Sequence, residues 1–153
     1  MKPHDAKPDW FPAFVEELRA FAAELPSDIA SFEWDGEFVW LELRAPTKAH
    51  RSLSVGASAL DMEYSLGKLW TEFGKPDEAL ARYVLAACDA VRAGKVREVR
   101  DRRTGLIYHV YRLTTRGLNE FARDSGYSLW HWLKLPIRKV KIARLSPLPL
   151  VGI

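Results

Sequence analysis

The chain has 153 residues with a formal net charge of +3, and 48% of its residues are hydrophobic and 28% charged. This composition excludes a disordered or fibrous chain and favours one α+β domain over residues 1–153, long enough to bury a substantial core. No apolar run approaches the ~20 residues that span a bilayer, and a signal peptide is not recognisable.

The first predicted element is a helix at residues 9–25, where apolar side chains recur every three or four positions. Asp9 is the expected N-cap, Pro12 lies in the first turn, and the Pro-Ser-Asp sequence at 26–28 ends the helix.

Residues 31–44 predict a β-hairpin, because polar and apolar side chains alternate on both sides of Asp35-Gly36. An Asp-Gly pair suits the two central positions of a type I′ turn, which need positive φ angles. The second arm leaves two sets open for the core: Phe38, Trp40 and Leu43, or Val39, Leu41 and Leu43.

Residues 51–58 and 59–74 predict two further strands. In the second of these, alternation separates an apolar face from a polar face. The apolar face comprises Leu60, Met62, Tyr64 and Leu66, and the polar face comprises Asp61, Glu63 and Ser65.

A second helix is predicted at 77–94, with Asp77 and Glu78 at its positive N-terminal end and Gly94 at its exit. Its expected buried stripe comprises Leu80, Tyr83, Val84, Ala87, Cys88 and Val91. A hairpin at 95–115, turning near 103–105, and a short helix at 116–124 follow.

The last segment, 134–153, is basic and contains proline. Residues 137–145 predict an edge strand, where lysines also discourage aggregation, and the prolines beyond it favour a segment that wraps over the body. The pattern as a whole predicts an α+β fold: a mostly antiparallel, twisted sheet of five to seven strands with two main helices packed on one face.

The sequence carries no catalytic or metal signature, so we expect no enzyme, no cofactor and no metal site. The four histidines lie far apart along the chain, and no phosphate-binding loop is recognisable. Cys88 permits no internal disulfide, which favours a cytoplasmic protein, and its position predicts a core residue. A small enzyme whose site forms only in the fold remains an alternative. The alanine and arginine usage is typical of a bacterial protein.

Charge is unevenly distributed, since acids outnumber bases in residues 1–75 and bases outnumber acids in residues 76–153. Such asymmetry favours a charged partner. Two tryptophans near the first hairpin turn are candidate anchors among nearby acids. The predicted partner-binding residues are Glu33, Trp34, Asp35, Glu37, Trp40, Asp61 and Glu63.

Two basic segments, 92–103 and 134–144, provide a second candidate surface, which would contact an anion or nucleic acid. No recognised nucleic-acid-binding motif accompanies them, so a protein partner is the first hypothesis and nucleic acid the second. A membrane partner is not expected. The candidate residues are Arg97, Arg100, Arg102, Arg103, Arg138, Lys139 and Lys141.

Residues 60–113, about a third of the chain, resemble small bacterial proteins of the polymorphic-toxin immunity type. The likeness is carried by an amphipathic strand that ends in "GKLWTEFG", by the helix after it and by the charged hairpin "GKVREVRDRRTG". Many such proteins have a histidine in the first phrase, which this chain lacks. The resemblance implies a cytoplasmic α+β inhibitor that binds and neutralises a partner protein, such as a basic toxin domain.

Overall fold

The computed structural model describes the backbone of residues 8–47, 52–66, 69–101, 107–114, 117–123, 140–144 and 147–149. Side chains are described for residues 8–47, 52–66, 72–97 and 147–149.

The fold is α+β, as the sequence predicts. In chain order its elements are α1 (Trp10–Ala23), β1 (Ala30–Trp34), β2 (Val39–Leu43), β3 (Leu53–Ala57), β4 (Asp61–Leu66), β5 (Leu69–Gly74), α2 (Glu78–Arg92), β6 (Val96–Asp101), β7 (Ile107–Thr114), β8 (Gly117–Arg123) and β9 (Val140–Arg144).

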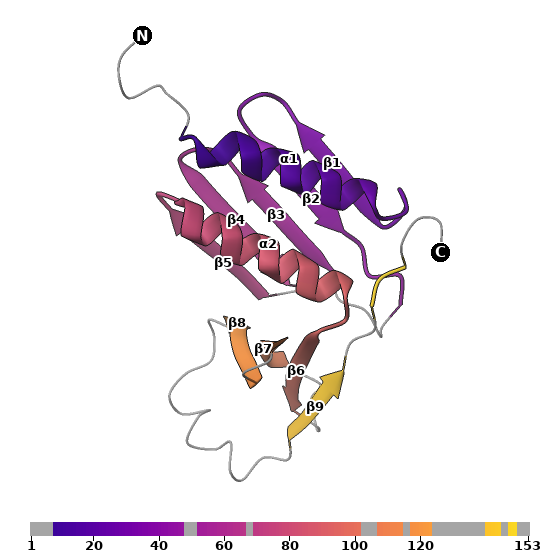
Figure 1. Cartoon of the computed structure of the whole chain (residues 1–153). Coiled ribbons are helices and arrows are strands. Elements are labelled where there is room, and N and C mark those ends of the chain that lie inside the picture. The colour runs from indigo at the N-terminus through magenta and orange to yellow at the C-terminus, as the bar shows by residue number, and fades with distance from the viewer. Residues whose placement is uncertain are drawn as a thin grey trace.

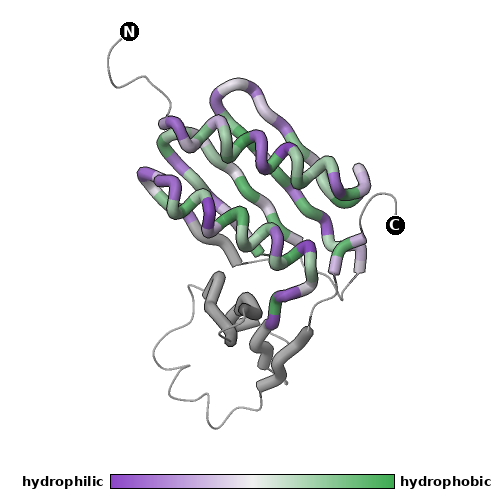
Figure 2. Tube along the Cα trace, in the orientation of Figure 1, coloured by the Kyte–Doolittle hydropathy of each residue, from purple (hydrophilic) through white to green (hydrophobic). Residues whose placement is uncertain are grey.

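The first five strands form an antiparallel meander in the order β1-β2-β3-β4-β5, and both helices lie across one face of it (Figure 1). Hydrophobic residues recur along both helices (Figure 2). On α1 the buried ones are Phe11, Phe14, Val15, Leu18 and Phe21, which share one side of the helix.

The strand register completes the core beneath the helices. Val39 pairs with Ala57, Leu41 with Val55 and Leu43 with Leu53, and the chain of pairs continues into β4. The side chains in these pairs are completely buried or nearly so. Of the two alternatives for the second strand of the first hairpin, Val39, Leu41 and Leu43 therefore face the core. Each such aliphatic side chain contributes about 1.5–3 kcal/mol by leaving water.

Strands β6 to β9 form a second, antiparallel sheet in the order β8-β7-β6-β9. The second sheet contacts the first sheet where β8 meets β5, and it contacts the second helix where β7 meets α2. The hairpin predicted at 95–115 is confirmed as β6 and β7, although its turn lies outside the described residues. The edge strand predicted at 137–145 is also confirmed, because β9 pairs only with β6 among the described strands.

After β9 the C-terminal segment returns to the first sheet and its two helices. Leu148 is 4% exposed, and its backbone N–H donates to the carbonyl oxygen of Arg92 at 2.8 Å. It belongs to the same buried cluster as the helix–sheet core. The expected wrapping segment therefore contributes a core side chain, and the exposed prolines Pro147 and Pro149 flank it.

Several local predictions were wrong. Residues 59–74 form two strands, β4 and β5, which pair with each other instead of continuing as one. Residues 116–124 do not form a helix, because the seven-residue strand β8 pairs with β7 in an antiparallel ladder. Leu60 is 75% exposed, since it precedes β4 in the tight turn that Ser58 closes.

The turn of the first hairpin is not type I′. Gly36 has a φ of +98°, whereas Asp35 is not among the described residues with positive φ. Asp35 Oδ1 instead accepts from the backbone N–H groups of Glu37 and Phe38, at 2.8 and 2.7 Å. This Asx-type arrangement makes a four-residue loop in place of the two-residue turn.

Candidate functional site

The sheet face opposite the helices is the candidate site. In the described part of the chain no helix lies across it, and its side chains follow from the pairing register. One row runs across all five strands of the first sheet, because Glu33 pairs with Trp40, Trp40 with Gly56, Gly56 with Glu63 and Glu63 with Glu72. We define the open face as Glu33, Phe38, Trp40, Glu42, Gly56, Asp61, Glu63 and Glu72.

An aromatic pair lies at the centre of the open face. The rings of Phe38 and Trp40 are stacked, with centroids 6.3 Å apart and planes inclined by 19°. Both rings converge over Gly56: an added Cβ there would lie 2.5 Å from Cζ3 of Trp40 and 3.1 Å from Cζ of Phe38. Phe38 nevertheless remains 41% exposed, so the pair presents aromatic surface to solvent.

Carboxylates surround this pair on four of the five strands. Glu33, Asp61 and Glu72 are exposed and Glu63 is half-buried, and no Lys or Arg among the described residues pairs with any of them. Glu42 is the exception, because Arg44 lies 3.7 Å from it. The open face therefore has a large excess of negative charge.

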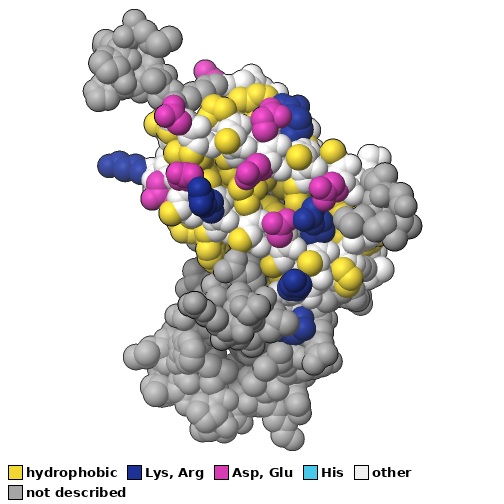
Figure 3. Space-filling view, viewed as in Figure 1, with side chains coloured by type: hydrophobic (Ala, Val, Ile, Leu, Met, Phe, Trp, Pro, Cys, Tyr) yellow, Lys and Arg dark blue, Asp and Glu magenta, His cyan; other side chains and the backbone are white. Residues whose placement is uncertain are grey.

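The helix side of the molecule differs in this respect. Acidic and basic side chains are interspersed over it (Figure 3), and the arginines of α1 and α2 are paired with acids. Arg19 lies 3.4 Å from Glu16, Arg82 lies 2.8 Å from Glu78, and Arg92 contacts Glu24 and Asp89. Charge on this side is largely balanced within the molecule.

The predicted partner-binding residues divide into two groups. Glu33, Trp40, Asp61 and Glu63 come together on the open face, as the alternation of β1, β2 and β4 requires. Trp34 lies on the opposite side of the sheet, where its ring meets Phe11 edge-on at a centroid distance of 5.8 Å. Asp35 and Glu37 lie in the turn at the end of the sheet, and Asp35 shapes that turn.

The structure adds Phe38, Glu42 and Glu72 to the candidate site, and gives Gly56 a role there. Phe38 lies two residues before Trp40 and therefore on the same face of the strand. The sequence pattern allowed this pair, with Leu43, as one of two alternatives for the core. Glu72 could not be assigned to a face of the sheet, because the sequence pattern predicted one strand over residues 59–74 where the structure has β4 and β5. Gly56 has no side chain and so left no signal in the alternation.

The basic candidates lie mainly in the second sheet. The β6–β9 register places Arg97 opposite Arg144 and Arg100 opposite Lys141. The Arg97 guanidinium donates to the carbonyl oxygens of Gly94 and Val96, at 3.3 and 3.0 Å. The remaining candidates, Arg102, Arg103, Arg138 and Lys139, lie outside the described residues.

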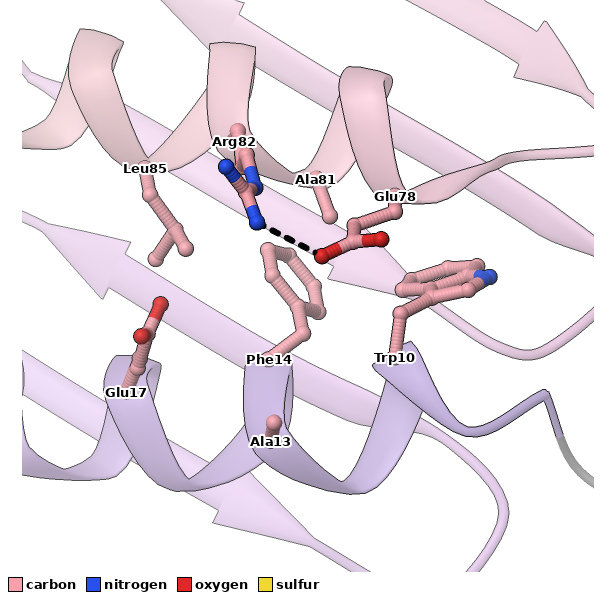
Figure 4. Close-up of a pocket in the computed structure, with 8 residues that line it drawn as sticks. All are labelled: Trp10, Ala13, Phe14, Glu17, Glu78, Ala81, Arg82 and Leu85. Atoms are coloured by element: carbon pink, nitrogen blue, oxygen red, sulfur yellow. Dashed lines mark hydrogen bonds and ion pairs between the residues drawn. The ribbon is translucent and has the colours of Figure 1, made fainter.

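A shallow groove of about 160 Å³ separates the two helices (Figure 4). Trp10 and Phe14 line it from α1 and Leu85 from α2, while the Arg82–Glu78 ion pair crosses its mouth. Ligand pockets for small molecules usually exceed roughly 300 Å³, so this groove suits no more than a single side chain.

Cys88 is fully buried on α2, and burial, followed by the charge of Asp89, raises the pKa of its thiol from 9.0 to about 12. A thiol with so high a pKa is a poor nucleophile at neutral pH. Within the described ranges, no three His, Cys, Asp or Glu side chains are grouped to hold a metal ion. Nor does the described part of the chain contain a helix long and apolar enough to span a bilayer.

Comparison with protein-family models, with curated proteins and with solved structures finds no match to this chain.

Proposed function

We propose that this chain is a non-enzymatic, cytoplasmic protein-binding module of the immunity type, which neutralises a basic partner such as a toxin domain. The open face would be the surface that binds. The observation that carries the proposal is the cluster of carboxylates, with no Lys or Arg partner among the described residues, around the exposed Phe38 and the half-buried Trp40.

Electrostatic complementarity supports a basic partner. A surface of one charge sign accelerates encounter with a surface of opposite sign and disfavours partners of like charge. Glu33, Glu63 and Glu72 lie in one row that crosses the sheet from β1 to β5, so the same face carries negative charge at both of its edges. The helix side, with its paired charges, offers no comparable field.

Rigidity supports binding through the same face. The reverse side of β2 and β4 is buried against the helices, which fixes the backbone beneath Trp40 and Glu63. A preformed surface loses little conformational entropy on association. Tryptophan is the residue type most enriched among interface hot spots, so Trp40 is the expected anchor.

The test is capture of a partner with charge-reversed variants. The full chain, the open-face variant Glu33→Lys/Glu63→Lys and the control Glu16→Lys/Asp28→Lys would be immobilised and exposed to lysate from the source cells. Both variants change the net charge equally, but the control residues are exposed on and near α1. We expect a basic protein to be retained by the full chain and by the control, and lost by the open-face variant.

Neutralisation requires a second measurement. The captured protein, expressed alone in a host cell, should arrest growth, and co-expression of this chain should restore it. Rescue should fail with Glu33→Lys/Glu63→Lys and persist with the control. A partner retained equally by both variants would contradict the assignment of the open face, and a partner that is harmless alone would contradict the immunity role.

Nucleic-acid binding is the second candidate, and the β6–β9 register is the observation that favours it. Cationic residues stand directly opposite one another at two positions, Arg97 with Arg144 and Arg100 with Lys141. Like charges directly across a ladder are unfavourable unless an anion or solvent screens them. An electrophoretic mobility shift at low salt, lost steeply as salt rises, would support this candidate, and absence of any shift would remove it.

A further inference from the structure

The shape of the aromatic pair restricts what it can bind. The planes of Phe38 and Trp40 differ by only 19°, and both rings lie over the side-chain-free position of Gly56. Two nearly parallel rings, of which Phe38 is 41% exposed, present an aromatic surface that we call the platform, whereas recognition of a quaternary or methylated ammonium group needs several rings that enclose it. The platform therefore favours a planar group that stacks on it.

Charge selects among planar groups. Glu33 flanks Trp40 on β1, and Glu63 flanks Gly56 on β4, so carboxylates stand on both sides of the platform. Strands are about 4.8 Å apart, which places the two glutamate backbones roughly 14 Å from each other with the platform between them. A cation stacked on the rings would be within the range of both side chains.

We infer that the open face recognises an arginine side chain of its partner, with the guanidinium stacked on Phe38 and Trp40 between Glu33 and Glu63. Guanidinium is planar and weakly hydrated, and when stacked it keeps its N–H donors at the ring edge free for carboxylates. A lysine ammonium is a compact, strongly hydrated point charge that cannot stack in this way. This inference rests on the proposed protein-binding function and specifies its chemistry.

The experiment uses three peptides of identical length, each with two copies of arginine, lysine or citrulline separated by glycine. Citrulline retains the planar shape of arginine and lacks its charge. Each peptide would be titrated at low salt into the ¹⁵N-labelled full chain, following the Trp40 indole N–H and the Gly56 amide. We expect the arginine peptide to bind about tenfold more tightly than either of the others, within the range of cation–π contributions.

Two variants test the two parts of the platform. Glu33→Gln/Glu63→Gln should weaken arginine binding severalfold and remove the preference over citrulline, while Glu16→Gln/Asp28→Gln should leave both unchanged. Trp40→Ala should abolish binding, with circular dichroism confirming that the variant is folded. Equal affinity for the arginine and lysine peptides, shifts that map away from Gly56, or no measurable binding would each overturn the inference.

The outcomes separate this inference from the proposed function. Capture of a basic partner that depends on Glu33 and Glu63, without preference for arginine in the peptides, would leave the protein-binding function standing and remove the arginine site. An arginine preference located at Trp40, with no partner captured from cells, would support the site and count against the immunity role.

Discussion

The indole of Trp40 lies over Gly56 so closely that Cζ3 and Cε3 are 2.5 and 2.7 Å from the position of an added Cβ. The strand register brings the two residues together, since they are direct partners in the β2–β3 ladder. An aromatic ring over a cross-strand glycine covers backbone that would otherwise be exposed. The same contact holds the indole in the centre of the open face.

We predict that Gly56→Ala destabilises the protein by about 1–2 kcal/mol, because the indole must leave its position and its stacking with Phe38 is lost. The natural control is Gly74→Ala in β5, where nothing lies within 4 Å of an added Cβ. There alanine should stabilise the protein slightly, by up to about 0.5 kcal/mol, because the unfolded chain has less backbone freedom to lose with alanine than with glycine. Urea unfolding measures both, and equal stabilities for the two variants would contradict the packing described for Trp40.

The two helix N-termini give a second matched pair. Asp77 Oδ1 accepts from the backbone N–H of Leu80 at 2.8 Å, whereas Asp9 makes no capping hydrogen bond and has helical φ and ψ angles of −56° and −31°. The structure places Asp9 at the N-cap position, as the sequence predicts, but without a capping hydrogen bond from its side chain. We predict that Asp77→Ala costs about 1 kcal/mol of unfolding free energy and Asp9→Ala no more than a few tenths. Thermal or urea unfolding of the two variants would decide the point, and equal losses would contradict it.

Local patterns predicted the helices and the α+β class well, because the apolar residues of α1 and α2 recur with the helical period in long segments. Alternation also placed Asp61 and Glu63 correctly on one face of β4. These properties depend on residues close together in the chain, and the sequence displays them directly.

Predictions that depend on tertiary pairing were less successful. In residues 31–44 both faces of the predicted strands carry large apolar side chains, so alternation alone did not decide whether Val39 or Trp40 faces the core. The helix α1 covers the face that carries Val39, and Trp34, the partner of Val39 in the ladder, packs against Phe11 of that helix. Similarly, β8 contains residues compatible with a helix, but the pairing offered by β7 determines its structure. The division of the nine described strands into two sheets has no local signal.

The C-terminal segment should contribute measurably to stability through one side chain. Leu148 is buried in the helix–sheet core although it is distant from it in sequence. We predict that Leu148→Ala costs about 2–4 kcal/mol, the range for removing a buried leucine side chain and leaving a cavity. Pro149→Ala, at the exposed neighbouring position, is the control and should change stability by less than about 0.5 kcal/mol. Comparable losses in the two variants would show that Leu148 has no special anchoring role.

The buried thiol of Cys88 makes stability depend on alkaline pH in a defined direction. Its pKa is raised by burial from 9.0 to about 12, so between these values the unfolded chain loses a proton that the folded chain retains. The folded state then binds more protons than the unfolded state, and stability must fall as pH rises. Well below pH 9.0 this contribution vanishes, because the thiol is protonated in both states.

A comparison of the full chain with Cys88→Ala isolates this effect from every other titrating group. Alanine removes the thiol at a position that small side chains already surround, since Val84, Ala87 and Val91 are its buried neighbours on α2. The stability advantage of the full chain over the variant should be constant from pH 7 to 8 and then decline by about 1 kcal/mol per pH unit above pH 9. Urea unfolding across this range measures it, together with thiol labelling, which should be slow in the folded state and fast in denaturant. A difference that does not change with pH would mean that the folded thiol ionises as readily as an exposed one.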